Sequence, residues 1–345
     1  ERGSSSMKRV IVILLSLFML AVVGAASGVM YVSSKVTDEL ALKSETLFTI
    51  ESGSNAYRTV KQLRKIGMTD VSPFVAKVWL KFFAGSTSVK SGTYMLRPGQ
   101  SLVDVFTLFT EGDEHLFAVS LVEGLTLAQW LEALKQNTDL VFDLNEGKLN
   151  QLTQDNGVDW CCENVSQTEG VYLADTYFFT KGTTASEVLK RAHRALIDFV
   201  SSEWELRDAE LPLATPYEAL ILASIIEKET AVPAERDMIS GVFVNRLNRN
   251  MRLQTDPTVI YGIGPTFDGN ITRKHLRTAT PYNTYVIKGL PPTPIAMAGK
   301  AAIHAALHPL TTDALYFVAK GDGSHQFSTT LAEHNAAVRK YQLKR

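Results

Sequence analysis

Short apolar runs alternate with apolar stripes of helical spacing in the first part of the chain, and turns containing glycine separate them. A short apolar run bounded by turns indicates a strand, whereas apolar residues at positions i, i+3 and i+4 indicate a helix. The strand and helix pairs predicted in this way cover residues 47–50 and 56–66, residues 92–96 and 101–109, and residues 119–122 and 125–134. Ser101 followed by Asp104 is typical of a helix start. We therefore expect a small α/β subdomain over residues 45–116.

The rest of the chain carries mainly helical patterns. Residues 137–166 are polar and irregular, so we expect a variable surface region there. The later patterns predict helices, then a hairpin and a last helix, at residues 186–204, 215–229, 234–249, 315–319 with 325–328, and 331–343. Thr215, Pro216 and Glu218 mark the start of the second of these helices. The order of elements predicts an α+β fold with a larger domain over residues 117–345.

A single uncharged run near the N-terminus sets the expected location of the chain. Residues 10–32 contain no charged side chain, and at about 1.5 Å per residue they are long enough for a transmembrane helix. Lys8 and Arg9 keep the preceding end in the cytoplasm, which sends the rest of the chain across the membrane. The small residues 24–27 would also suit a cleaved signal peptide, but the apolar run is longer than such peptides have. Residues 1–6 look like a cloning remnant and are set aside.

Composition narrows the classes of partner. The chain has 35 basic and 36 acidic residues and no basic cluster with interleaved aromatic residues, so nucleic acid is not an expected partner. Cys161 and Cys162 are neighbours, and because a bridge between neighbours departs from ordinary disulfide geometry we expect free thiols. His304 and His308 lie four residues apart, but no H-E-x-x-H sequence accompanies them. We expect packing or surface histidines, no metal and no cofactor.

One carboxyl group falls where charge is poorly solvated. At about 100° per residue, Leu222, Ile225 and Ile226 form an apolar stripe with Glu229 near its middle, whereas Glu227 lies off the stripe. Burial raises the pKa of a carboxyl group, so Glu229 could stay protonated near neutral pH and act as a general acid. The competing interpretation is a glutamate that only solubilises a helix end.

A second segment, Glu169 to Phe178, places carboxylates among aromatic residues. Aromatic rings stack on sugar faces and acidic groups accept hydrogen bonds from sugar hydroxyls, so Glu169 and Tyr177 are candidate glycan ligands. A core strand with a helix cap explains the same residues equally well. The strand, turn and helix order of residues 45–116 is likewise that of small glycan-binding LysM modules, but it is also common in other α+β folds.

Five later blocks are more specific. They are ASIIEKET at 223–230, VFVNRL at 242–247, MRLQTDPT at 251–258, YNTY at 282–285 and GLPP at 289–292. In this order they resemble the signature blocks of the YceG/MltG family, the endolytic murein transglycosylases of bacteria. The resemblance runs from the apolar N-terminal segment to the C-terminus. It departs at Leu173-Ala174, where the family often has an aromatic residue and proline, and at the cysteine pair.

The resemblance implies a single-pass inner-membrane protein with a LysM-like subdomain and a periplasmic catalytic domain, residues 117–345, that cuts peptidoglycan glycan strands internally. The second glutamate of EKE is the family's catalytic residue and corresponds to Glu229. We expect it to protonate the oxygen between N-acetylmuramic acid and N-acetylglucosamine and then to take the proton of the muramyl C6 hydroxyl, which closes a 1,6-anhydro ring. The candidate sugar ligands of these blocks are Asn245, Gln254, Asp256, Asn283 and Tyr285. Asp256 would equally serve as the N-cap before Pro257.

Two other functions fit the sequence. The chain could be a non-catalytic scaffold that binds the cell wall and peptidoglycan synthases, and such synthases are expected partners of an enzyme as well. A hydrolase would need a second carboxylate, and Glu169 or Asp175 could pair with Glu229. The chemical nature of the product ends distinguishes the three functions.

Overall fold

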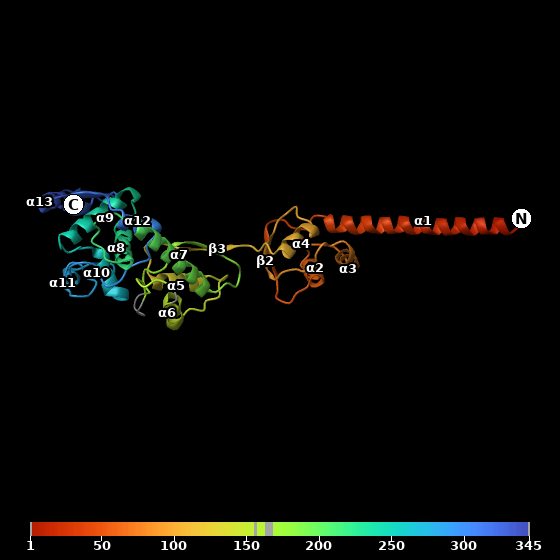
Figure 1. Cartoon of the computed structure of the whole chain (residues 1–345), viewed down its shortest axis with the longest axis horizontal. Coiled ribbons are helices and arrows are strands. Elements are labelled where there is room, and N and C mark those ends of the chain that lie inside the picture. Colours follow the sequence, from red (N-terminus) through yellow and green to blue (C-terminus); the bar gives the residue numbers. More distant parts are fainter. Residues whose placement is uncertain (1, 155–156, 163–167, 344–345) are drawn as a thin grey trace. The chain divides into compact units, whose positions relative to one another are not determined.

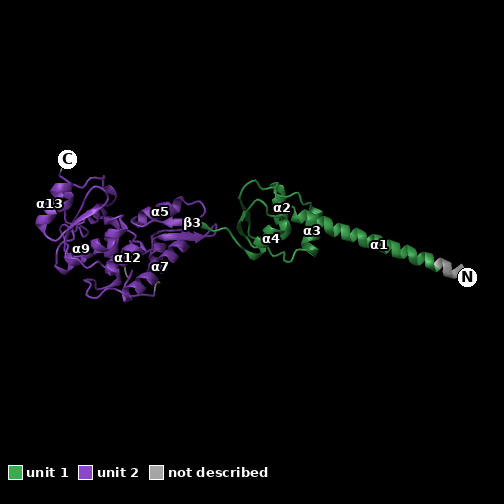
Figure 2. Cartoon of the chain, turned by 90° about the horizontal axis from the view of Figure 1, so that it is seen from above, with its two compact units in different colours: residues 1–117 green, residues 118–345 purple. Residues whose placement is uncertain are grey.

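A computed structural model describes residues 2–154, 157–162 and 168–343, and the chain divides into two compact units, Glu1–Phe117 and Ala118–Arg345 (Figures 1 and 2). The first unit contains α1 (Arg2–Thr37), β1 (Thr46–Ile50), α2 (Ala56–Lys65), α3 (Pro73–Phe82), β2 (Gly92–Leu96) and α4 (Leu102–Glu111). Most or all of each remaining element lies in the second unit: β3 (Phe117–Leu121), α5 (Leu127–Gln136), α6 (Glu146–Gln154), β4 (Asp175–Phe179), α7 (Ala185–Glu205), α8 (Pro216–Glu229), η1 (Pro233–Glu235), α9 (Arg236–Asn248), α10 (Asp256–Ile263), η2 (Gly264–Thr266), α11 (Arg273–Arg277), α12 (Lys300–Leu307), β5 (Tyr316–Ala319), β6 (His325–Ser328) and α13 (Leu331–Tyr341). This mixture of helices and strands confirms the predicted α+β class.

Helix α1 contains the apolar run and extends beyond it at both ends. The stretch Met7–Thr37 is long and apolar enough to cross a membrane, and its most apolar window is not buried within the protein. The last turns of α1 behave differently, because Val32 and Val36 are only 5% and 3% exposed and belong to the core of the first unit. The described chain therefore has one candidate membrane helix, and its end is built into the folded domain that follows.

The first unit follows the predicted order of strands and helices and adds one helix. Strands β1 and β2 pair antiparallel, and the capping box predicted from Ser101 and Asp104 is present at the start of α4. Helix α3 was not assigned from the sequence, although Ser72 caps it and Pro73 begins it. Its Trp79 packs edge-on against Phe106 of α4, with ring centroids 4.9 Å apart, and so closes the small core. The likeness to a LysM module stays a prediction.

The second unit is organised around α8. Every residue of this helix from Ala219 to Ile226 is buried, and α9 and α12 pack against it. Three alanines at positions 302, 305 and 306 are buried in α12, and small side chains let helices approach closely. Two two-stranded sheets lie outside this helical centre, β3 with β4 and β5 with β6. The helices and the hairpin predicted for this region are thus confirmed within a few residues.

The expectation of an irregular segment over residues 137–166 is wrong in part. Helix α6 occupies Glu146–Gln154, and the Asn145 side chain accepts a hydrogen bond from the Lys148 amide at its start. Leu149 and Thr153 are its buried residues, and the helix packs against α7. The helix was not predicted because its sequence is polar and only one turn of it is buried. The remainder of the segment includes residues 155–156 and 163–167, which lie outside the described residues.

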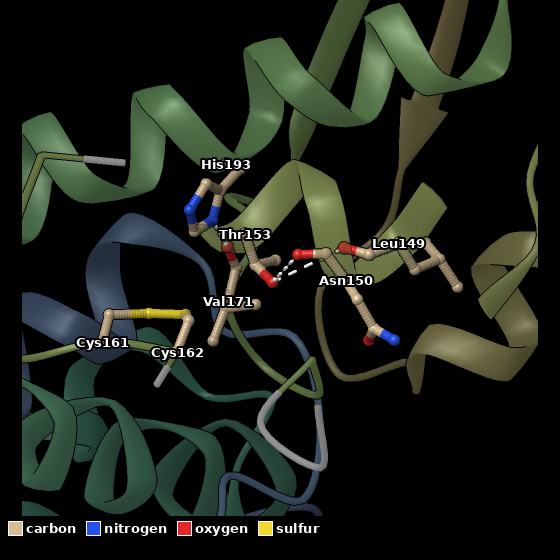
Figure 3. Close-up of a disulfide and its surroundings, with 7 residues drawn as sticks. All are labelled: Leu149, Asn150, Thr153, Cys161, Cys162, Val171 and His193. Atoms are coloured by element: carbon tan, nitrogen blue, oxygen red, sulfur yellow. Dashed lines mark hydrogen bonds between the residues drawn. A yellow bond between two sulfur atoms is a disulfide. The ribbon is translucent and has the colours of Figure 1, made fainter. Parts of the chain in front are cut away.

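The expectation that Cys161 and Cys162 are free thiols is also wrong. The two cysteines are joined in a disulfide (Figure 3), and both are buried, with 5% and 4% of their surface exposed. The prediction rested on the departure of a bridge between neighbours from ordinary disulfide geometry, and it did not consider an unusual backbone conformation at either cysteine. Cys162 instead has a φ of 71°, in the left-handed region that few residues other than glycine adopt.

Candidate active site

Helix α8 carries the candidate acid at its C-terminal end. It begins as predicted, with Thr215 accepting a hydrogen bond from the Glu218 amide and with Pro216 in the first turn. The Glu218 carboxylate, however, accepts from the amide of Ala214 and not from the N-cap residue. Glu229 is the last residue of the helix and is partly exposed, so it lies where the buried helix reaches the surface.

The distinction drawn between Glu229 and Glu227 from a one-sided apolar stripe is wrong. Helix α8 is buried around its circumference, so a residue off the stripe also meets protein. The Glu227 side chain is 7% exposed, and its Oε2 accepts a hydrogen bond of 3.0 Å from the Gly299 amide. Burial raises the pKa of Glu227 as well. Burial alone therefore does not show whether Glu227 or Glu229 is the catalytic acid. The side chains and loops around each carboxyl group distinguish the two.

Thr255 is the direct hydrogen-bond partner of Glu229. Its hydroxyl donates to Glu229 Oε1, and the residue itself is only 2% exposed. Its backbone is held by two further threonines: its amide donates to Thr284 Oγ1 at 3.0 Å, and its carbonyl accepts from Thr258 Oγ1 at 2.8 Å. This buried threonine cluster fixes the loop before α10 against the end of α8.

Several charges act on the Glu229 carboxyl group. Burial raises its pKa most, and the neighbouring Asp256 carboxylate raises it further. The Thr255 hydroxyl stabilises the ionised form and lowers the pKa, as do the charges of His325 and Arg246. The net direction is upward, so the group holds its proton at a higher pH than an ordinary glutamate.

Arg246 supplies a buried positive charge that the sequence analysis did not single out. It is 7% exposed, and its guanidinium donates to the backbone carbonyls of Leu315 at 2.6 Å and Leu253 at 2.7 Å. These contacts tie α9 to the hairpin and to the loop before α10. Arg246 belongs to the VFVNRL block, from which the sequence analysis selected only Asn245 as a candidate sugar ligand. The block therefore pointed to the right region, but to a different residue.

Asp256 and Tyr285 form a pair beside Glu229. Asp256 is not the N-cap of α10; Thr255 occupies that position and Asp256 is the first helical residue. Its carboxylate accepts a hydrogen bond of 2.6 Å from the Tyr285 hydroxyl, and burial followed by this contact raises the pKa of Tyr285. Gln254 lies on the same loop with a φ of 53°, and both Gln254 and Asp256 are exposed. Three predicted sugar ligands are thus brought together near the acid.

The other two predicted ligands in these blocks hold the backbone. The Asn245 amide group donates to the carbonyls of Thr312 at 2.6 Å and Ala314 at 3.0 Å. Asn283 is 1% exposed; its amide donates to the carbonyls of three residues, and its oxygen accepts from the Tyr285 amide. Those carbonyls belong to His275, Leu276 and Thr278. Asn283 therefore positions Tyr285, and a direct contact of either asparagine with sugar stays a prediction.

Glu169 belongs to a separate polar cluster. Its carboxylate accepts from the Leu127 amide at 2.9 Å and from the Tyr261 hydroxyl at 3.2 Å, and burial raises its pKa to about 7. Tyr261 lies on α10, toward the opposite end of that helix from Asp256. Neither Glu169 nor Asp175 is among the residues that most affect the Glu229 pKa.

Tyr177 and Asp175 lie on β4 and have other partners. The Tyr177 hydroxyl donates to the Leu173 carbonyl at 2.8 Å. Asp175 is exposed, and its carboxylate lies 3.5 Å from Lys300 Nζ. A role of Tyr177 in binding glycan stays a prediction, because its hydroxyl is used within the strand and its ring is only partly exposed.

His325 is a residue near Glu229 that the sequence analysis missed. Its Nδ1 lies 2.7 Å from Glu235 Oε2, and its amide donates to the other Glu235 oxygen at 2.9 Å. The residue begins β6, directly after the turn that contains Gly321 and Gly323. A histidine at the end of a glycine turn was the available signal, but nothing local connects it to α8.

One described group of side chains could hold a metal ion. Ligand atoms of Glu203, His304 and His308 all lie within 4.8 Å of one another. The His304 Nδ1 is 2.7 Å from Glu203 Oε2, and the His308 Nδ1 is 2.8 Å from Asp208 Oδ1. None of these residues is among the groups that most affect the Glu229 pKa, so the group has no evident part in the candidate acid site.

Comparison with known proteins identifies the family. A model of the YceG-like family matches residues 48–340, and the chain therefore belongs to that family. It is 34% identical over 313 residues to the protein named endolytic murein transglycosylase of Bacillus subtilis (strain 168), covering 87% of this chain and 85% of the relative. A protein of the same name from Streptococcus pneumoniae serotype 2 (strain D39 / NCTC 7466) is 26% identical over 339 residues, which is 85% of this chain and 60% of that protein. A crystal structure of a yceG-like protein from Listeria monocytogenes is 28% identical, with a TM-score of 0.54 over 86% of this chain and 99% of the other.

Proposed function

We propose that the chain is a membrane-anchored endolytic murein transglycosylase in which Glu229 is the general acid and then the general base. Family membership and the names of the relatives support the activity. The observation that carries the assignment of the residue is the contact of Glu229, at the end of a buried helix and with a raised pKa, with the loop that holds Gln254 and Asp256. Glu227 instead has the Gly299 amide and Arg236 as its partners, and none of the predicted sugar ligands is among the groups that most affect its pKa.

The reaction requires one group that gives and takes the same proton. Protonated Glu229 donates to the oxygen between N-acetylmuramic acid and N-acetylglucosamine, and the bond from muramyl C1 to that oxygen breaks. The resulting carboxylate takes the proton of the muramyl C6 hydroxyl, whose oxygen forms a new bond to C1. Glu229 is then protonated again, no water is consumed and the cut strand ends in a 1,6-anhydro ring. The internal hydroxyl needs no second carboxylate to position a water molecule.

The surroundings of Glu229 suit both halves of this cycle. Burial and Asp256 favour the protonated form that begins the reaction, whereas Thr255 stabilises the carboxylate that forms in its middle. Positive charge from Arg246 and His325 adds to the second effect. A proton donor and acceptor works best when its pKa lies near the ambient pH, and both upward and downward influences act on the pKa of Glu229.

The exposed loop beside the acid is the proposed place for the sugars. Gln254, Asp256 and Tyr285 would accept from or donate to sugar hydroxyls and acetamido groups. Asn283 positions Tyr285, and Asn245 holds the segment before β5. Helix α1 would hold this machinery at the inner membrane, with the N-terminus in the cytoplasm and both folded units in the periplasm. There the substrate would be a polymeric glycan strand.

Analysis of product ends tests the proposal. The purified full chain is incubated with sacculi, and the new ends are identified by mass spectrometry. A transglycosylase produces 1,6-anhydro-muramyl ends that are lost in Glu229→Gln. A hydrolase with two carboxylates would produce reducing ends, and a wall-binding scaffold would bind sacculi without producing new ends, so either result would overturn the proposal.

A further inference from the structure

Helix α3 and the residue after it leave three phenylalanine rings facing away from the core of the first unit. Phe74 is 74% exposed, Phe82 66% and Phe83 47%, and the last two rings lie 6.4 Å apart. The opposite side of α3, around Trp79, is buried. Three neighbouring exposed phenylalanines are unusual on a protein surface that faces water. A cluster of exposed apolar side chains usually marks a site of contact with a protein or a membrane.

These rings lie beside the apolar helix α1. An apolar groove of about 290 Å³ is lined by α1 residues between Ala25 and Val32 and by Phe74, Phe82 and Phe83. Helices α1 and α3 also pack against each other directly, and both belong to the first compact unit. The position of α3 along α1 is therefore set by the fold.

The position of the α3 contact along α1 indicates the depth of α3 relative to the membrane. The segment from Ala25 to Val32 forms the last two turns of the uncharged run 10–32, and at 1.5 Å per residue it covers about 10 Å of the helix axis. If α1 crosses a membrane, as the proposed function states, these turns lie in the outer part of the bilayer. A helix packed beside them lies at the level where acyl chains meet headgroups, and amphipathic helices enter that zone to a depth of about 5–10 Å.

The charge of this region fits the same environment. Helices α2 and α3 contain basic residues and no acidic residue: Arg58, Lys61, Arg64, Lys65, Lys77 and Lys81. Lys81 Nζ lies 5.2 Å from the centre of the Phe82 ring, so a positive charge and an apolar ring are presented side by side. Lysine next to aromatic residues is the combination found at membrane interfaces, where the ring enters the apolar zone and the ammonium group reaches the phosphates.

We infer that α3 is a second membrane contact of this protein, in which Phe74, Phe82 and Phe83 enter the outer leaflet and Lys77 and Lys81 bind anionic lipid headgroups. The inference rests on the proposed anchor α1 and goes beyond it. An anchor alone leaves α1 and the unit attached to it free to tilt together in the bilayer, whereas a second contact fixes the unit against the bilayer surface. The partner is a phospholipid surface and not a glycan, because a sugar would need polar acceptors beside the rings, and α3 offers only lysines.

The test measures the depth of single labels in the full chain. Phe82→Cys, Phe18→Cys and Phe178→Cys are each labelled with an environment-sensitive fluorophore in vesicles of phosphatidylethanolamine and phosphatidylglycerol. Phe18 lies in the apolar run and reports the anchor, while Phe178, 56% exposed in the second unit, is the aqueous control. The unsubstituted chain is the labelling blank, since its two cysteines are joined.

Lipids brominated along their acyl chains quench labels inside the bilayer, and aqueous iodide quenches labels exposed to water. We expect the label at Phe82 to be quenched by brominated lipid and protected from iodide, as at Phe18, and the label at Phe178 to show the reverse. If Phe82 behaves like Phe178 while Phe18 stays protected, the anchor stands and the inference is wrong. If Phe18 is also open to iodide, the anchor itself is wrong.

Two further arms test the lipid chemistry. Replacing phosphatidylglycerol by phosphatidylcholine, or Lys77 and Lys81 by glutamate, should reduce lipid quenching at Phe82 and leave Phe18 unchanged. If lipid quenching at Phe82 stays the same in either experiment, α3 does not bind anionic headgroups. Protection of the Phe82 label by glycan fragments in detergent, without vesicles, would assign this surface to the cell wall and overturn the inference.

Discussion

Replacing Glu229 by glutamine is the sharpest test of the proposed chemistry. Glutamine keeps the shape of the side chain and an oxygen that can accept the Thr255 hydroxyl, so the end of α8 retains its hydrogen bond. It cannot give or take the proton that the reaction needs. We therefore expect a folded protein that binds glycan and does not cut it.

The expected loss is large because one group acts twice. A positioned acid or base contributes about 10²–10⁴-fold to a rate, and Glu229 is proposed to act in both roles, so the rate should fall by about 10⁴-fold, or about 5 kcal/mol of barrier. Stability should not fall with it. The pKa of Glu229 is raised in the folded protein, so ionisation disfavours folding as the pH rises above the unfolded value, and glutamine removes this effect.

Glu227→Gln is the matched control. The residue lies on the same helix, its side chain is 7% exposed and burial also raises its pKa. Glutamine keeps an oxygen for the Gly299 amide. We expect activity within about twofold of the unsubstituted chain, because this group transfers no proton in the proposed cycle.

The assay follows the rate at which anhydro ends appear in digested sacculi, with thermal unfolding of each variant measured in parallel. Retention of a tenth or more of the rate by the Glu229 variant would refute its role. A larger loss in the Glu227 variant than in the Glu229 variant, with both proteins folded, would move the assignment to Glu227.

Four other outcomes are expected. Thr255→Val removes a hydrogen bond that favours the carboxylate, so the alkaline limb of the pH-rate profile should move to higher pH. Asp256→Asn removes a charge that raises the Glu229 pKa, so the same limb should move to lower pH; equal or reversed movement in the two profiles would contradict the electrostatic argument. Glu169 is protonated in both states below about pH 4 and has a folded pKa of about 7 instead of 4.5, so Glu169→Gln should match the unsubstituted chain in acid and be about 1–3 kcal/mol more stable at pH 9 in denaturant unfolding. Asn283→Ala removes a buried amide group that donates to three backbone carbonyls and should lower the free energy of unfolding by about 2–3 kcal/mol, which calorimetry would detect as a reduced melting temperature.

Local sequence chemistry was sufficient to predict most elements of this fold. The capping box of Ser101 and Asp104 and the start at Thr215 and Pro216 are contained in a few neighbouring residues, and the structure has both. Helix α6 was missed because only one turn of it is buried. Patterns within a helix report how much apolar surface the helix has, and a short polar helix gives little signal.

Tertiary surroundings could not be predicted in the same way. Glu227 was placed off the apolar stripe and still became buried, because α9 and α12 cover more than one face of α8. Arg246 and His325 approach the same carboxyl group from α9 and from the hairpin, which are far apart in the sequence. The sequence allowed Asp256 to be either a sugar ligand or the N-cap of α10, and the structure has Thr255 as the N-cap.

The neighbours Thr255 and Asp256 show why a short block of sequence can carry the tuning of an active site. One residue is buried and donates a hydrogen bond to Glu229, which lowers its pKa; the next is exposed and negative, which raises it. Because Thr255 is the N-cap and Asp256 the first residue of α10, the start of that helix turns the two side chains to different surroundings. A group that must release and recover one proton needs both influences, and here two consecutive residues supply them.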